Sequence, residues 1–209
     1  YILEKLVKLN KPMIVSLSNG GPVLMPWRHD VQAIIEQYLA GQASGSALAD
    51  IVFGRVSPMG SLAETIPNHL DDIPANQNFP GHPKQVQYRE GLFVGYRAYD
   101  HLDIEPAYPF GFGLSYCKID YKDINIYHDI EHKRIIIKGQ VMNQGNYDIK
   151  ALIQVYVSKK KSLVYRPKQA LIRFEKYFVK ARSSAPFNFE IQEKDLQIFQ
   201  DTYVLEEGT

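Results

Sequence analysis

The acidic residues of this chain are the first candidates for chemistry, because paired carboxyl groups perform general acid–base catalysis. Glu90 stands out among them, since Arg89 and Arg97 lie close to it in the sequence. An ion pair between Glu90 and one of these arginines is the preferred interpretation, and a catalytic role is the alternative. Asp71 and Asp72 are adjacent, and neighbours in an extended segment point in opposite directions. We therefore do not expect them to flank one scissile bond.

Three other motifs match known kinds of site only in part. His128 and His132 are four residues apart, but the residues between them predict a hairpin turn rather than a zinc site. Ser44 and Ser46 lack the Gly-x-Ser-x-Gly order of a nucleophile elbow. We expect one of them to cap a helix, with backbone amides facing a ligand oxygen as the alternative. Gly111-x-Gly113 lacks the third glycine of a dinucleotide fingerprint. The sequence thus predicts no catalytic residue, no metal ligand and no cofactor-binding residue.

The composition is that of a globular protein without a strongly charged partner. A net charge of +1 over 209 residues provides no field that would collect nucleic acid or an acidic membrane surface. No apolar run approaches the roughly 18 residues of a membrane helix, and the basic run Lys159–Lys161 predicts a solvated loop. The single cysteine, Cys117, excludes an internal disulfide and leaves the compartment open, with the cytoplasm slightly favoured over secretion.

The first part of the chain has the pattern of an α/β domain. Residues 3–10 predict a short amphipathic helix. The nearly continuous apolar run 13–17 is typical of a strand buried on both faces of a parallel sheet. Residues 33–39 are ambiguous between strand and helix, and their position favours a strand. Residues 45–53 predict a helix that ends at Gly54. This order predicts an open, mostly parallel sheet covered by helices.

The last part of the chain predicts an antiparallel β-sandwich. Three segments alternate apolar and polar residues with period two, at 133–141, 149–157 and 187–191. Turn residues at 143–146 and 181–184 separate them. Such alternation indicates strands with one buried and one solvated face.

The predicted fold class is therefore α/β plus all-β. We expect a partial α/β sandwich over residues 1–67, a linker packing between domains over 68–115, and a β-sandwich over 116–209 whose last strand is missing. Residues 67–109 are rich in proline, asparagine, aspartate, histidine and aromatic residues, which predicts a long ordered connection. The chain begins inside a helix-like segment without an initiator methionine, so we expect it to be a piece of a longer protein.

Short motifs follow a fixed order along the chain. They are Asn19-Gly20-Gly21-Pro22-Val23, Gly41-Gln42, Ala49-Asp50-x-x-Phe53-Gly54, Ser57-Pro58-x-Gly60-x-Leu62, Tyr88-x-Glu90-Gly91-x-Phe93-Val94-Gly95-Tyr96-Arg97 and Pro109-Phe110-Gly111-x-Gly113-Leu114. This order resembles the α/β sandwich domain of glycoside hydrolase family three. The later motifs are similar to that family's fibronectin type III-like domain: Val141-x-Asn143-x-Gly145, Val155-Tyr156-Val157, Arg166-Pro167 and Leu171-x-x-Phe174-Glu175-Lys176.

The resemblance implies a retaining exo-glycosidase, typically a β-glucosidase. Retaining hydrolysis needs two carboxyl groups about 5 Å apart. In the family, the nucleophilic aspartate lies on an N-terminal barrel, and the acid/base glutamate lies upstream of the turn that corresponds to Asn19–Val23. Both would precede Tyr1, so no catalytic residue is carried over, and the piece alone is expected to be inactive. The implied partners are the missing barrel domain and a glycoside or oligosaccharide substrate of the full-length protein, with a homo-oligomer as a further possibility.

Four positions depart from the family pattern. Ala43 replaces an acidic residue, Ser61 and Ala63 replace the usual arginine and proline, and Phe112 stands where histidine is common. For this reason we carry over no expectation about the contacts of these loops or the preferred sugar, whereas the expected fold stands, since the glycines and apolar positions remain. A non-catalytic carbohydrate-binding or interaction module is the alternative function, because aromatic residues between Phe79 and Tyr108 could stack on sugar rings.

Overall fold

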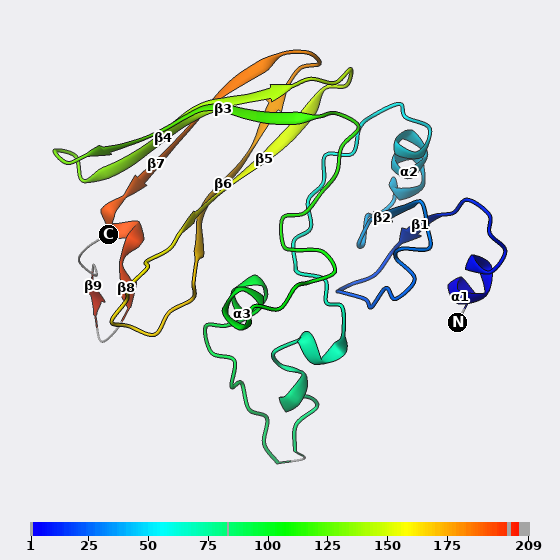
Figure 1. Cartoon of the computed structure of the whole chain (residues 1–209), viewed down its shortest axis with the longest axis horizontal. Helices are drawn as coiled ribbons and strands as arrows, with labels where there is room; N and C mark the ends of the chain where they lie inside the picture. The colour runs from blue at the N-terminus through cyan, green and yellow to red at the C-terminus, as the bar shows by residue number, and fades with distance from the viewer. Residues whose placement is uncertain (1, 83, 200–201, 205–209) are drawn as a thin grey trace. The chain divides into compact units, whose positions relative to one another are not determined.

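The structure, a computed structural model, describes residues 2–82, 84–199 and 202–204 (Figure 1). Contacts divide the chain into two compact units. Unit 1 comprises the chain up to Phe53 together with Leu62–Phe110, and unit 2 comprises Gly54–Ser61 together with the chain from Gly111 onward. Within the described residues, no helix is both long enough and apolar enough to cross a bilayer.

Unit 1 contains a small parallel sheet, short helices and two single-turn 3-10 helices. Its elements are α1 (Ile2–Val7), β1 (Ile14–Leu17), β2 (Ala33–Glu36), α2 (Ser44–Val52), η1 (Leu70–Asp72), η2 (Asn76–Asn78) and α3 (Tyr96–Leu102). Strands β1 and β2 pair in parallel, with Ile14 opposite Ala33 and Leu17 opposite Glu36. The predicted parallel pairing is confirmed, and in the ambiguous segment 33–39 the strand covers Ala33–Glu36.

Two local expectations for unit 1 are wrong. Strand β1 is not buried on both faces, because only Val15 is buried and Ile14 is 55% exposed. No serine caps α2: the N-cap residue is Ala43, which makes no side-chain cap bond, and the Ser46 hydroxyl donates back to the Ala43 carbonyl oxygen at 2.9 Å. Ser46 lies inside the first turn, where this bond to the preceding turn competes with capping.

The long connection in unit 1 is ordered, and its two ends lie side by side. Ile66 N donates to the Tyr108 carbonyl oxygen at 2.8 Å, and Ala107 N donates to the Ile66 carbonyl oxygen at 2.9 Å. Ile66 is 2% exposed, and Ala98 and Tyr99 of α3 are also buried. The paired backbone and these buried side chains anchor a segment that has little regular secondary structure.

Unit 2 contains two antiparallel sheets. Its elements are β3 (Ile119–Asp129), β4 (Arg134–Asn143), β5 (Ile149–Val157), β6 (Ala170–Val179), β7 (Ser184–Gln192), η3 (Glu193–Leu196), β8 (Ile198–Phe199) and β9 (Tyr203–Val204). One sheet has the order β3-β4-β7, the other pairs β5 with β6, and β8 and β9 form a separate two-stranded pair. The three predicted strands correspond to β4, β5 and β7. Strands β3 and β6 were not predicted.

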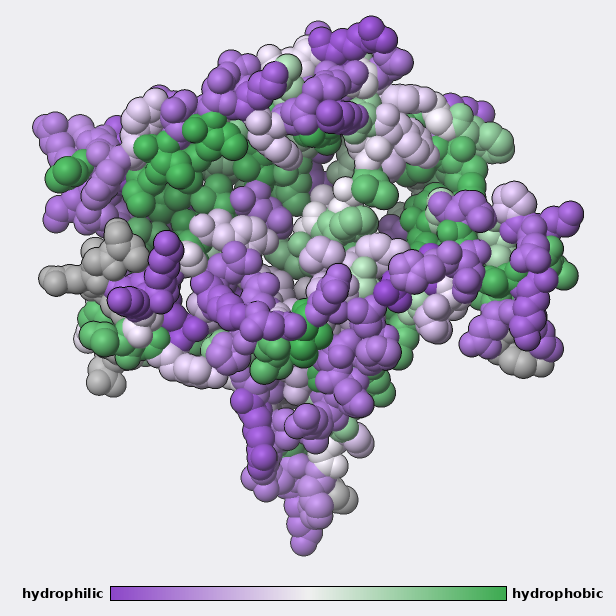
Figure 2. Space-filling view, viewed as in Figure 1, coloured by the Kyte–Doolittle hydropathy of each residue, from purple (hydrophilic) through white to green (hydrophobic). Residues whose placement is uncertain are grey.

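The core of unit 2 lies between its two larger sheets. Val141 and Ile149 are at most 1% exposed, and they pack with Val179, Phe187 and Phe189. The alternating residues of β4, β5 and β7 face this core, as their period-two pattern requires. Apolar side chains also remain at the surface, where Figure 2 shows a hydrophobic area over the β3-β4-β7 sheet (upper left).

Residues 54–61 pack against the strands of unit 2. Tyr116 N donates to the Ser57 hydroxyl oxygen at 2.9 Å, and Lys176 Nζ donates to the Met59 carbonyl oxygen at 2.9 Å. A Cβ atom on Gly113 would overlap the Gly60 carbonyl oxygen. Gly113 of the Pro-Phe-Gly-x-Gly motif therefore serves close backbone packing against the Ser57-Pro58-x-Gly60 motif.

The β3–β4 turn carries an ion pair that predicts acid-dependent stability. Arg134 Nε donates to Asp129 Oδ2 at 2.8 Å, and this bond, with those from His132, lowers the pKa of Asp129 to about 2. The folded pKa is below the unfolded value of about 3.9. The ionised Asp129 carboxylate therefore stabilises the folded state above about pH 4, and this contribution is lost as the pH falls toward about 2.

Replacing Asp129 with asparagine should flatten the pH dependence of unfolding in that range. Urea denaturation at pH 7, 4 and 2.5 measures this effect. Asp123→Asn is the matched control, because Asp123 is exposed on the same strand and asparagine tolerates its positive φ of 53°. An acid dependence unchanged by Asp129→Asn would contradict the prediction.

Candidate functional site

Unit 1 contains a cavity of about 470 Å³. Its wall is mainly apolar, and the residues that matter for its chemistry are Pro22, Glu64, Thr65, Tyr96, Tyr99 and Phe110. They come from the turn after β1, the segment that leads to Ile66, helix α3 and the end of the connection. The volume lies within the range of about 300–1,000 Å³ that is usual for small-molecule sites.

Glu64 brings a carboxyl group to this apolar wall. Burial raises the pKa of Glu64 above its ordinary value, the neighbouring hydroxyl of Tyr38 opposes that rise, and the charge of Glu36 adds to it. The Tyr38 hydroxyl is itself buried and lies close to Glu64 but outside good hydrogen-bonding geometry. A carboxyl group in such surroundings holds its proton more tightly than an exposed one.

Thr65 provides a second polar group. The residue is 7% exposed, and its Oγ1 atom is buried with no hydrogen-bond partner among the described residues. Burial follows from the pairing of the adjacent Ile66 with Tyr108. An unpaired buried hydroxyl costs about 1–3 kcal/mol, so this residue carries a local penalty to stability.

Aromatic side chains form one wall of the cavity. The rings of Tyr96 and Phe110 are stacked, with centroids 5.3 Å apart and an interplanar angle of 15°. Tyr96 begins α3 directly after Gly95, whose φ of 54° favours glycine. Burial, with a smaller contribution from the charge of Asp72, raises the pKa of Tyr99 to about 12. Tyr99 therefore stays neutral over the physiological range.

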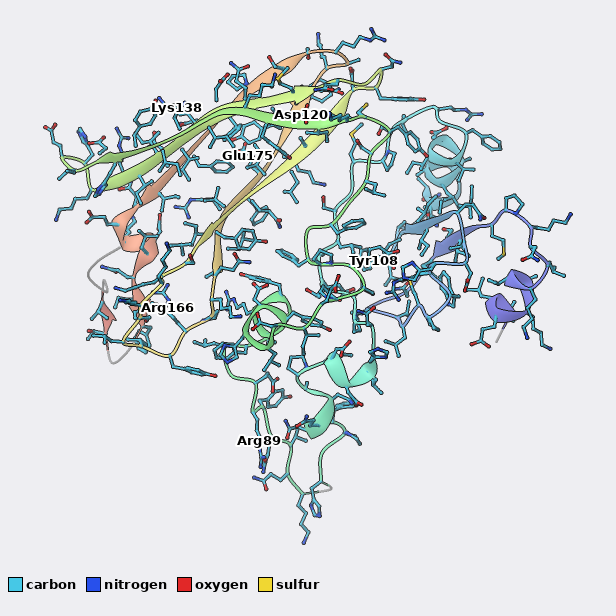
Figure 3. All side chains as sticks on the ribbon, in the orientation of Figure 1. Arg89, Tyr108, Asp120, Lys138, Arg166 and Glu175 are labelled. Atoms are coloured by element: carbon cyan, nitrogen blue, oxygen red, sulfur yellow. The ribbon has the colours of Figure 1, made fainter. Side chains whose placement is uncertain are left out.

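Glu90, the main candidate from the sequence, makes no ion pair within the part of the chain that the structure describes. Its Oε2 atom is buried without a hydrogen-bond partner among the described residues, and neither Arg89 nor Arg97 pairs with it. Arg89 is exposed (Figure 3), and the Arg97 guanidinium carbon lies 5.9 Å from the ring centroid of Tyr96. The predicted ion pair is therefore wrong, because the fold directs the two arginines elsewhere.

The aspartates of the connection have separate structural partners. Asp72 Oδ2 accepts hydrogen bonds from the backbone nitrogens of Asn68, at 3.1 Å, and His69, at 2.8 Å. Asp71 Oδ1 accepts a bond from Asn76 Nδ2 at 3.1 Å. Neither carboxyl group lines the cavity. Their bonds fix the single turns η1 and η2.

The two histidines of the β3–β4 hairpin face different partners. His132 Nδ1 lies 3.0 Å from Asp129 Oδ1, and His128 Nε2 lies 3.8 Å from Glu193 Oε1. Within residues 2–82, 84–199 and 202–204, no group of three or more histidine, cysteine, aspartate or glutamate side chains is arranged to hold a metal ion.

The four departures from the family pattern lie at different places. Ala43 is the exposed N-cap of α2, and the exposed Ala63 lines the cavity beside Glu64. Ser61 and Phe112 are half-buried in unit 2. Sequence analysis missed Tyr38, Glu64 and Thr65, because no motif joins them and only folding brings Tyr38 next to Glu64.

Comparison with known proteins identifies both units. Residues 1–116 match the model of the glycosyl hydrolase family 3 C-terminal domain, and residues 151–209 match the fibronectin type III-like domain. Together with the parallel β1–β2 pair and the antiparallel sandwich, these matches define the C-terminal region of a glycoside hydrolase and confirm the predicted fold class. The chain belongs to glycoside hydrolase family 3.

Individual relatives agree with this assignment. The chain is 44% identical over 195 residues to thermostable beta-glucosidase B of Acetivibrio thermocellus, covering 92% of this chain and 26% of that protein. It is 36% identical to an exo-alpha-(1->6)-L-arabinopyranosidase of Bifidobacterium longum, covering 97% of this chain and 27% of that protein. The crystal structure of a Bifidobacterium adolescentis GH3 beta-glucosidase superposes with a TM-score of 0.93 at 40% identity, covering 99% of this chain and 31% of that one. The chain thus spans about a quarter of the length of the curated relatives it matches.

Proposed function

We propose that this chain is the C-terminal part of a retaining, exo-acting β-glycosidase that hydrolyses terminal β-linked sugars of glycosides, with a β-glucosidase preferred. The 44% identity to a thermostable beta-glucosidase over 92% of the chain carries this proposal. The proposed domains are the C-terminal part of an α/β sandwich over residues 1–67, a linker packing between domains over 68–115 and a fibronectin type III-like β-sandwich over 116–209. The proposed partners are an upstream barrel domain and a glycoside or oligosaccharide substrate.

In this proposal the chain is scaffold and pocket wall, and both catalytic carboxyl groups belong to upstream segments. Retaining hydrolysis needs two carboxyl groups about 5 Å apart. Glu64 is the acidic residue on the cavity wall. Glu36 is near enough to raise the pKa of Glu64, but it lies off the wall, and its Oε1 atom accepts a bond from Tyr38 N at 2.8 Å. This arrangement supports a structural rather than a hydrolytic role for the two glutamates.

An assay on an aryl β-glucoside tests the proposal. The purified chain should give no turnover, because it lacks the nucleophile and the acid/base residue. A chimera, in which this chain replaces the matching region of the Acetivibrio thermocellus enzyme, should release the aryl group. Clear turnover by the chain alone would refute the scaffold role, and a folded but inactive chimera would count against the glycosidase assignment.

Substrate class follows from the same chimera. Because a 36% identical relative is an exo-alpha-(1->6)-L-arabinopyranosidase, an aryl α-L-arabinopyranoside should be assayed in parallel. Faster release from the glucoside supports the β-glucosidase assignment. A non-catalytic carbohydrate-binding module predicts instead that glucose binds the isolated chain saturably, which the fluorescence of Trp27 would report.

A further inference from the structure

One sheet of unit 2 has an apolar face that the other sheet covers only in part. In the β3–β4 pairing, Tyr121 lies opposite Val141. Further along, Ile126 lies opposite Ile137. Opposite residues of an antiparallel pair share one face, and Val141 and Ile137 both pack in the core between the sheets. Tyr121 and Ile126 therefore face the other sheet, yet they are 45% and 69% exposed.

The β5–β6 sheet is open on the side of this uncovered face. Among the described residues, β5 pairs only with β6, and β6 contacts β4 and β7. The Tyr121 hydroxyl donates to the Leu152 carbonyl oxygen of β5 at 3.3 Å, so β5 approaches β3. The edge of β5 that does not pair with β6 is therefore directed toward the space over β3. Such an edge presents a row of backbone N–H and C=O groups without ladder partners.

The core of unit 2 continues into this open space. Ile149 and Ala151 of β5 are at most 2% exposed. Ile153 and Val155 of the same strand also pack against the core, but they are only half-buried. Figure 2 shows a hydrophobic area over the β3-β4-β7 sheet. The apolar surface is thus continuous with the core, unlike apolar side chains that are scattered singly over a surface.

An open strand edge beside an apolar face indicates the chemistry of a partner. A lipid or a small apolar molecule would cover the side chains but would bury backbone N–H and C=O groups of β5 without partners, which costs free energy. An extended peptide meets both requirements, because its backbone pairs with the edge while every second side chain enters the apolar face. The remaining side chains of such a peptide point away from the core and are best polar.

We propose that unit 2 binds an extended polypeptide segment of alternating apolar and polar residues along the open edge of β5. The segment adds a strand to the β5–β6 sheet, and its apolar side chains cover Tyr121 and Ile126 of β3. The inference goes beyond the expected absence of a last strand, because it gives the edge and the face on which an added strand binds, and it holds for a strand from a separate molecule. It does not depend on the proposed hydrolase function.

Titration of synthetic peptides into the complete chain, followed by calorimetry, tests the inference. The first peptide alternates valine and threonine over nine residues, the length of β5. The second has the same composition with all valines in one block. We expect the first to bind saturably and the second to bind about tenfold more weakly or worse, since only alternation places every valine on one face. Equal binding of the two peptides, or no saturable binding of the first, would overturn the inference.

Backbone methylation of the first peptide tests the pairing with the edge of β5. One version carries N-methyl groups on all valine nitrogens, and the other carries them on all threonine nitrogens. Successive N–H groups of a strand point to opposite edges, so only one version has its methyl groups toward β5. That version should bind about tenfold more weakly or worse, because it loses several hydrogen bonds of about 1 kcal/mol each. Equal binding of both versions would contradict strand addition.

Two substitutions locate the bound segment on β3. Ile126→Asp and Tyr127→Asp introduce the same charge at neighbouring positions on opposite faces of the strand, and both residues are more than half exposed. Ile126→Asp should weaken binding of the alternating peptide about tenfold or more, because it buries a carboxylate in the interface. Tyr127→Asp should change binding by less than about twofold. Equal effects of the two variants would contradict the proposed face. A concentration-dependent dimer of the chain that binds no peptide would identify a second copy as the occupant and would also overturn the inference.

Discussion

Replacing Asn143 with aspartate is expected to destabilise unit 2 by about 4 kcal/mol at pH 7. The Asn143 side chain is buried at the end of β4, where the residue is 2% exposed. Its Nδ2 atom donates to the carbonyl oxygens of Tyr147, at 2.7 Å, Lys180, at 3.1 Å, and Val179, at 3.2 Å. Aspartate would place a carboxylate against these acceptors, so the variant loses the donors and buries an unpaired charge.

The pH dependence of this variant provides a second signature. Burial beside carbonyl oxygens should raise the folded pKa of the introduced carboxyl above its unfolded value of about 3.9. The destabilisation should therefore be smallest below about pH 4 and should grow as the pH rises through the folded pKa. Urea denaturation at pH 4 and pH 7, followed by circular dichroism, measures both effects.

Asn146→Asp is the matched control for this prediction. This substitution makes the same amide-to-carboxylate change in the same turn. Asn146, however, is exposed, and its Oδ1 atom accepts a bond from Arg182 Nε at 2.8 Å. An acceptor at this position remains an acceptor, so we expect a change within about 0.5 kcal/mol. An equal loss of unfolding free energy in Asn143→Asp and Asn146→Asp would show that the buried Asn143 amide does not stabilise the turn.

Gly139→Ala is expected to cost about 2–3 kcal/mol, because it overfills the core. Gly139 of β4 lies directly opposite Phe187 of β7, and its added Cβ atom would stand 2.5 Å from Cζ and 2.7 Å from Cε1 of the Phe187 ring. The ring has little freedom to move, since it is 5% exposed and packs against Tyr177 and Phe189. The denaturation midpoint of unit 2 should fall accordingly.

A double-mutant cycle isolates the clash between these two positions. Phe187→Leu alone should cost about 1–2 kcal/mol, since it removes part of a buried ring. In the double variant the shorter side chain makes room for the new Cβ, so the total loss should be smaller than the sum of the single losses by about 1 kcal/mol or more. Additive losses would mean that the Gly139→Ala cost arises from the backbone and not from the ring.

The strands of unit 2 show where period-two alternation of apolar and polar residues predicts a strand and where it fails to do so. The alternation correctly predicted β4, β5 and β7, because each has one face toward a common core. It missed β3, where Ile126 pairs with Ile137 and yet is 69% exposed. The pattern weakens there because residues 121–128 of β3 are exposed on both faces, so no apolar–polar alternation is required of them.

The candidate site was less accessible to prediction than the fold. Glu90 was singled out because Arg89 and Arg97 are near it in the sequence, but neither arginine forms an ion pair with it in the folded chain. Tyr38 and Glu64 attracted no attention, because they belong to no shared motif and meet only through the fold of unit 1. The partners of a side chain depend on which segments distant in sequence come together, and local sequence patterns carry no information about this.

By itself, the sequence determined the family, the division into α/β and all-β parts and the direction of the β1–β2 pairing. These properties follow from local backbone preferences and from motifs that each occupy a few consecutive residues. Only the tertiary structure decided that residues 54–61 pack on unit 2, that Asn143 bonds three carbonyl groups and that Thr65 lines a cavity without a partner. Each of these features depends on contacts between segments that are distant in sequence, and the periodicity of a single segment does not determine such contacts.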